Sequence, residues 1–183
     1  MSEAYQERRK TSDEDGKRAQ NEFEKAAEIF GFYVIRASGE QDMFQHWDRM
    51  IIQDPFAEFV DVKAMKDVHA SGYTWIEHQN KFGNDGWLRG KELKYPRTIA
   101  FENHDCFDIV DVHELRKLID AKVDWTKPIL RNRVELSYMI YRQYCRSGND
   151  DRLILTPYAD IVPLVNKKLY KDGRLERIIS VGI

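Results

Sequence analysis

Two short segments that alternate apolar and polar residues flank a turn signal at Asp54-Pro55, and they constrain the fold more than any other part of the sequence. Residues 47–52 and 58–65 are rich in β-branched and aromatic side chains, which favour strands. Because a strand alternates its side chains between two faces, Asp61 points away from its apolar neighbours. The segment therefore predicts a β-hairpin.

This hairpin brings three charged side chains together. A turn centred between Asp54 and Pro55 sets Asp48 opposite Asp61, about 5 Å away across the strands if no bulge intervenes. Lys63 lies two residues beyond Asp61 and projects from the same face. Two carboxylates and one ammonium group on one surface are unusual for a strand pair.

Two converging carboxylates are the least that a protein has to supply for metal-assisted hydrolysis of a phosphodiester. Mg²⁺ takes oxygen ligands, usually one or two carboxylates together with waters and substrate. The cation lowers the pKa of a bound water and neutralises charge that builds on the phosphate. Asp48 and Asp61 are therefore candidate ligands of Mg²⁺ or Mn²⁺. The alternative is that Asp61 and Lys63 form an ordinary surface ion pair.

The rest of the sequence predicts an α+β fold, with a mixed sheet flanked by helices. Residues 1–15 are polar and expected to be frayed. Apolar residues recur at three- and four-residue steps from Asp15 to Phe30, which predicts a helix that Gly31 ends. Further strands are expected at residues 32–37, 73–79, 98–101 and 106–110, and a second helix is expected to begin at Asp111.

The sequence pattern changes after Asp124. We expect residues 16–124 to form the core and residues 125–183 to form a hairpin and helix extension packed on the same domain. Within the extension the pattern predicts a hairpin of residues 137–144 and 153–157, a short helix near 159–169 and a turn at 171–174.

Length and composition fit one soluble domain. A chain of 183 residues can bury a core, and no apolar run approaches the roughly 18 residues of a membrane helix. Cys106 and Cys145 match no metal or redox spacing and are expected to be buried thiols in a reducing cytoplasm. The net charge is -2, but basic residues are in excess within 81–100 and 127–152.

The order of a helix, a strand, a strand with Asp48 and a strand with Asp61-Val62-Lys63 resembles the PD-(D/E)XK nuclease superfamily, which has the restriction-endonuclease-like fold. The first 65 residues are most similar to Holliday-junction-resolvase-type members, and the similarity lies in Gly16, Phe23-Glu24 and Gly31-Phe32. Trp47 departs from the pattern, because the family has proline there.

The resemblance implies roles for the matched residues. Glu24, Asp48 and Asp61 would hold the metal, and Lys63 would orient the attacking water or stabilise the transition state. The segment 75–88 is similar to uncharacterised phage-type members, which suggests a phage or mobile-element origin. The resemblance covers roughly residues 16–120.

A second assignment within the same fold stays open. Glu77-His78-Gln79 resembles the same active-site element, since some members of the superfamily carry Gln in place of Lys. Asp61 would then be the upstream carboxylate, and Glu77 and Gln79 would share the site with the first set.

Basic and aromatic side chains around the site are candidate contacts to nucleic acid. They are Lys17, Arg18, Lys66, Trp87, Arg89 and Lys91. Trp87 is explained equally well as a core residue.

The expected function is that of a Mg²⁺-dependent DNA endonuclease, with RNA as the other substrate to test. A Holliday-junction or other structure-specific resolvase is the first alternative, and it requires a homodimer. The second is a non-catalytic module that binds nucleic acid or protein on a nuclease scaffold.

Overall fold

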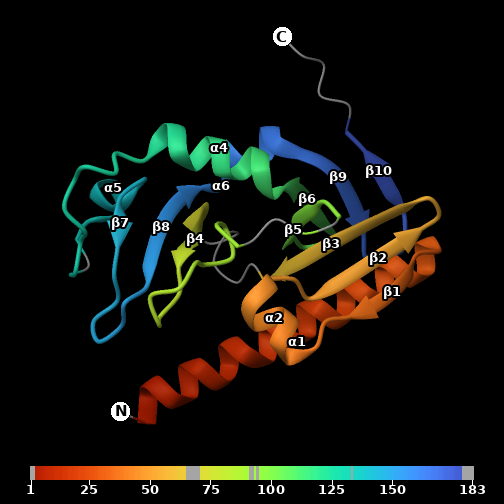
Figure 1. Cartoon of the computed structure of the whole chain (residues 1–183), viewed down its shortest axis with the longest axis horizontal. Coiled ribbons are helices and arrows are strands. Elements are labelled where there is room, and N and C mark those ends of the chain that lie inside the picture. Colours follow the sequence, from red (N-terminus) through yellow and green to blue (C-terminus); the bar gives the residue numbers. More distant parts are fainter. Residues whose placement is uncertain (1–2, 65–70, 91–92, 94, 133, 179–183) are drawn as a thin grey trace.

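The computed structural model describes residues 3–64, 71–90, 93, 95–132 and 134–178, which form a mixed α+β fold (Figure 1). The helices are α1 (Glu3–Phe30), α2 (Gly39–Gln45), α4 (Val112–Lys122), α5 (Leu136–Met139), α6 (Tyr158–Ile161) and the 3-10 turn η1 (Val162–Leu164). The strands are β1 (Tyr33–Arg36), β2 (Arg49–Gln53), β3 (Phe56–Lys63), β4 (Tyr73–Gln79), β5 (Arg97–Glu102), β6 (Cys106–Asp111), β7 (Gln143–Tyr144), β8 (Arg152–Pro157), β9 (Val165–Tyr170) and β10 (Leu175–Arg177).

The strands form two sheets. A curled sheet has the order β1-β2-β3-β5-β6-β9-β10, and a smaller sheet has the order β4-β8-β7. In the larger sheet β3 and β5 run parallel, whereas the other neighbours are antiparallel. The predicted mixed sheet is therefore confirmed.

The β2–β3 hairpin has the predicted register. Arg49 pairs with Val60 and Gln53 with Phe56, so the turn falls at Asp54-Pro55. The regular pairing stops at Arg49, because the Asp48 amide donates to the carbonyl of Val60, the residue with which Arg49 already pairs, at 2.8 Å.

Helix α1 covers one face of the larger sheet. Its apolar stripe, which includes Ala19 and Phe23, is fully buried against Val60 and Val62 of β3. The helix ends at Gly31, which has a φ of 108° that favours glycine. The helix begins at Glu3, twelve residues before the expected start at Asp15.

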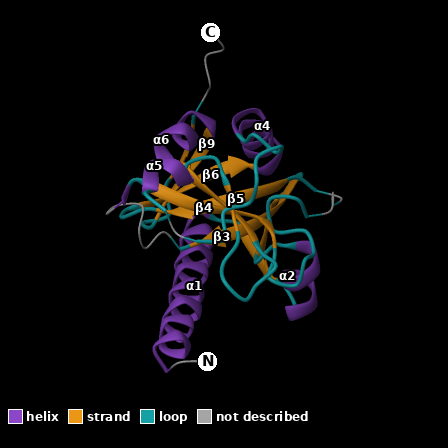
Figure 2. Ribbon diagram, turned by 90° about the vertical axis from the view of Figure 1, so that its left-hand side faces the viewer, coloured by secondary structure: helices purple, strands orange, loops and turns teal. Residues whose placement is uncertain are grey.

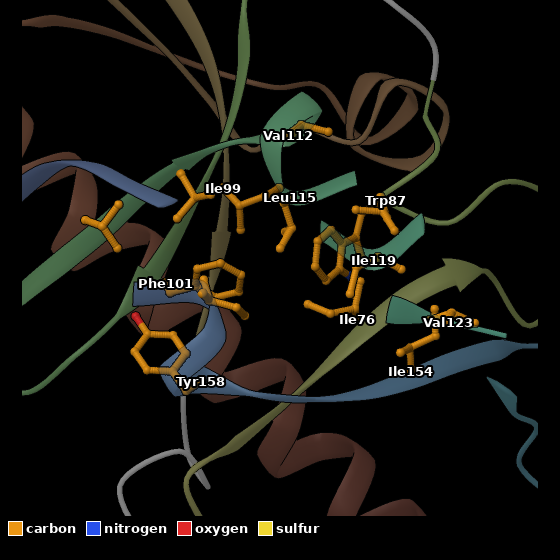
Figure 3. Packing of buried hydrophobic residues seen from close by; sticks show 14 residues of the cluster. Ile76, Trp87, Ile99, Phe101, Val112, Leu115, Ile119, Val123, Ile154 and Tyr158 are labelled. Carbon is orange, nitrogen blue, oxygen red and sulfur yellow. The ribbon is translucent and has the colours of Figure 1, made fainter. Parts of the chain in front are cut away.

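The other face of the sheet carries a second core. Helices α4 and α6 lie on the opposite side of the strands from α1 (Figures 1 and 2). Phe101 of β5 packs there with Trp87, Tyr158 and Ile76 (Figure 3). Helix α4 begins as predicted, because the Asp111 carboxylate accepts from the amides of the first turn.

Two predictions for the C-terminal part are wrong. The expected continuous strand 137–144 begins with the helical turn α5, and within it Gln143–Tyr144 pairs with β8 while Ile140 forms an isolated bridge to Leu155. The expected helix 159–169 ends early and becomes β9, which pairs with β6. The physical reason is that β6 offers a ladder of backbone groups, a non-local partner that the local pattern does not contain. The C-terminal residues thus complete the main sheet.

The predicted turn at 171–174 is confirmed, since it joins β9 to β10. In the described part of the chain, no helix has an apolar stretch long enough to cross a membrane.

Candidate active site

The predicted acidic pair forms where β3 ends and β2 begins. Asp48 and Asp61 are 6% and 4% exposed. The Asp48 side chain reaches across the hairpin, and its Oδ2 accepts from the Val62 amide at 2.7 Å. The Asp48 carboxylate therefore binds the backbone of β3 next to Asp61.

Lys63 belongs to the same cluster. Its Nζ lies 2.7 Å from Asp61 Oδ1 and 5.0 Å from the centre of the Trp87 ring. Trp87 is only 7% exposed and packs in the second core, which favours the alternative of a core residue over the expected contact to nucleic acid. A carboxylate and an aromatic face together hold the ammonium group at the site.

One oxygen of the pair lacks a partner. Within the described residues, Asp61 Oδ2 is buried and accepts no hydrogen bond. A buried carboxylate oxygen without a donor is costly, and a metal ion or an ordered water supplies what is missing.

The two carboxylates repel each other. Burial, with the negative charge of Asp61 added to it, raises the pKa of Asp48 to about 8. Burial works to lower the pKa of Lys63, but the charges of Asp61 and Asp48 outweigh it and the pKa is raised. The site therefore holds an ammonium group and a carboxyl that keeps its proton near neutral pH.

Gln20 of helix α1 is part of the site and was not predicted. Its Nε2 donates to Asp48 Oδ1 at 2.7 Å. Gln20 lies one helical turn before Glu24, on the same side of the helix. That spacing was the available signal, but a neutral side chain did not stand out from the sequence.

Glu24 does not join the two aspartates. Its carboxylate binds Arg36 and Arg49, each with Nε–Oε2 at 2.8 Å, and the hydrogen bond from Arg36 chiefly lowers its pKa. Arg49 in turn donates to the main-chain oxygen of Asp48 at 2.9 Å. Glu24 thus supports the backbone of the site through Arg49.

No group of three His, Cys, Asp or Glu side chains in the described ranges is spaced to hold a metal ion. The expected role of Glu24 as a metal ligand beside Asp48 and Asp61 stays a prediction, while in the structure its carboxylate is paired with Arg36 and Arg49.

Glu77 and Gln79, the two residues of the alternative active-site element on β4, lie in different surroundings. Glu77 lies against Gly86, where an added Cβ would meet its Cγ at 2.9 Å. Burial raises the pKa of Glu77, and the charge of Lys63 opposes that effect. Gln79 instead donates to the Asp150 carbonyl at 2.7 Å, beyond an irregularity in the pairing of β4 with β8.

Helix α2 adds an acidic residue that was not predicted. Burial, and after it the negative charge of Asp61, raises the pKa of Asp42. The helix leads directly into the site, since His46 caps it and Trp47 and Asp48 follow. Asp42 therefore belongs to the electrostatic surroundings of the aspartate pair.

The two arginines predicted to contact nucleic acid are engaged in ion pairs. Arg18 binds Glu102 at 2.6 Å and Glu22 at 3.0 Å, and Arg89 binds Asp120 through both guanidinium nitrogens. Lys17 is exposed on α1. Lys66 and Lys91 lie outside the described residues.

No protein-family model matches the sequence, and a comparison with curated proteins finds no match.

Proposed function

We propose that the protein is a Mg²⁺- or Mn²⁺-dependent DNA endonuclease built on a restriction-endonuclease-like core. The observation that carries the proposal is the buried pair Asp48 and Asp61 with the Lys63 ammonium 2.7 Å from one of them. One lysine balances only one of the two carboxylates, so Asp48 holds a proton near neutral pH in the metal-free protein, and a divalent cation would take the place of that proton.

The residues present fit a hard divalent cation. Asp61 Oδ2 is buried without a donor among the described residues, and burial, followed by the charge of Asp61, raises the pKa of Asp48 although the charge of Lys63 works to lower it. Asp48 and Asp61 would hold the ion through oxygen, which Mg²⁺ prefers. When bound, the metal would acidify a water and neutralise charge on the phosphate.

The chain's own groups orient the reactants. Gln20 and the Val62 amide fix the Asp48 carboxylate from two sides. Lys63 keeps its proton and presents N–H donors beside Asp61, where they can position the attacking water or stabilise a phosphate oxygen. The Trp87 ring beneath the ammonium keeps bulk water from that side.

A nicking assay on supercoiled plasmid with increasing Mg²⁺ or Mn²⁺ tests the function. Nicking by the parent should require the metal, and Asp61→Ala should abolish it. Asp54→Ala is the matched control, because Asp54 lies at the exposed turn of the same hairpin. If Asp61→Ala retains full activity while folded, the mechanism is wrong. Linear, nicked, flapped and four-way DNA in the same assay identify the preferred substrate.

A further inference from the structure

The turn after β4 presents an aromatic ring to solvent. Phe82 is 71% exposed, and the Nζ of Lys81 lies 4.8 Å from the centre of its ring. Within the described residues Lys81 makes no ion pair, in contrast to the arginines near the site. We call residues 80–84 the β4 turn.

The β4 turn is held by its own hydrogen bonds. Asn80 Oδ1 accepts from the amides of Phe82 at 2.9 Å and Asn84 at 3.1 Å. The Asn80 amide donates to the Asn84 carbonyl at 2.8 Å, and Gly83 adopts a φ of 84°. The Phe82 backbone is thus fixed with the ring outside the core, although an exposed ring contributes no burial to folding.

The β7–β8 loop supports the β4 turn from the other side. Gln79, at the end of β4, donates to the Asp150 carbonyl at 2.7 Å, and the Asp150 amide donates to the Lys81 carbonyl at 3.4 Å. Figure 1 shows the loops that follow β4 and β7 side by side. Gln79 thus has its hydrogen-bond partner in the β7–β8 loop.

The residues that directly follow the β4 turn connect it to the candidate active site. The Asp85 carbonyl accepts from the His46 ring at 3.0 Å, and Gly86 packs on Glu77. Trp87, the next residue, lies under the Lys63 ammonium. From Glu77 to Asn80 a strand covers about 10 Å, which is about three base steps along DNA.

We propose that Lys81 and Phe82 form a DNA contact a few nucleotides from the cleaved phosphate. Phe82 would stack on the face of an unpaired base, and Lys81 would pair with a backbone phosphate. A base face is open only where the duplex is frayed, gapped or single-stranded, so the substrate class is DNA with unpaired bases beside the cleavage site. The proposal rests on the nuclease function and adds the form of its substrate.

Fluorescence anisotropy tests the contact directly, in an Asp61→Asn background that prevents cleavage. The probes are a fluorescein-labelled duplex with an unpaired end and the same sequence fully paired. Phe82→Ala should weaken binding to the unpaired-end probe about ten-fold and leave the fully paired probe nearly unaffected. Phe82→Trp should restore binding, because any aromatic face can stack. Lys81→Gln should reduce the salt dependence of binding by about one phosphate contact.

Phe56→Ala is the matched control. Phe56 is 68% exposed but lies at the opposite end of β3 from Lys63, so its loss should not change binding. Unchanged affinity of folded Phe82→Ala for the unpaired-end probe overturns the contact. If Asp61→Ala also abolishes nicking in that case, the nuclease function stands without the contact.

The remaining outcomes separate the two proposals. If Phe82→Ala loses binding while Asp61→Ala still nicks, the contact stands and the metal site is wrong. If the parent binds neither probe with or without Mn²⁺, both proposals are overturned.

Discussion

Gln20 Nε2 donates to Asp48 Oδ1 at 2.7 Å, and this bond joins helix α1 to the acidic pair. The other oxygen of Asp48 accepts from the Val62 amide at 2.7 Å. The carboxylate is therefore held by a helix on one side and a strand on the other. Outer partners of this kind orient a metal ligand and tune its affinity.

Removal of the Gln20 amide should weaken metal binding. We expect Gln20→Ala to lower Mn²⁺ affinity about ten-fold and the free energy of unfolding by about 1 kcal/mol, because Asp48 loses one of two donors. Isothermal titration with Mn²⁺ and urea unfolding measure the two effects. Asn21→Ala, at the exposed neighbouring position, is the control. Equal Mn²⁺ affinity in both variants would contradict the positioning role of Gln20.

The pH dependence of the metal-free protein should identify Asp48. Its pKa is raised to about 8 in the folded state, against about 3.9 in an unfolded chain, so the folded state binds more protons between these values. Stability in EDTA should therefore fall as the pH rises through this window. Thermal unfolding at several pH values should show this slope in the parent and a smaller one in Asp48→Asn.

Metal affinity should depend on the protonation of the same Asp48 carboxyl, but it should rise with pH where the stability of the metal-free protein falls. Below pH of about 8 the cation has to displace a proton from Asp48, so Mn²⁺ affinity should rise with pH up to that value and then level off. Proton release, measured by titration in buffers of different ionisation enthalpy, checks this. Binding without proton release near neutral pH would rule out Asp48 as the titrating ligand.

Lys63 should matter for cleavage more than for DNA binding. We expect Lys63→Met to reduce the nicking rate about a hundred-fold or more, because the cluster loses its N–H donors beside Asp61. Affinity for DNA should change little, since one phosphate contact at most is lost. Lys25→Met, at an exposed position of α1, is the control for charge alone. A rate equal to that of the control would remove Lys63 from the mechanism.

Glu24 should contribute to the stability of the fold and not to metal binding. Glu24→Gln leaves the buried Arg49 guanidinium without a carboxylate, so we expect the free energy of unfolding to fall by about 3 kcal/mol. Mn²⁺ affinity of the folded variant should stay that of the parent, because Gln20 and not Glu24 contacts Asp48. A loss of Mn²⁺ affinity without a loss of stability would support the ligand role that the sequence suggested.

Predictions that depend on residues close together in the sequence differed in outcome from those that depend on a partner far along the chain. The register of Arg49 with Val60 follows from strand alternation and the turn between them, and it is confirmed. The helix expected over residues 159–169 failed, because β9 forms against β6 more than 50 positions earlier in the chain. The length of α1 was underestimated because its first residues carry no apolar stripe.

The sequence by itself determined the β2–β3 hairpin, in which Arg49 pairs with Val60, and the face of β3 that Asp61 and Lys63 share. Those positions are close along the chain, and strand periodicity alone decides where their side chains point. Only the tertiary structure decided which residue of α1 reaches Asp48. Burial of the Ala19 and Phe23 stripe sets the rotation of the helix against the sheet, and this rotation brings Gln20 to the carboxylate.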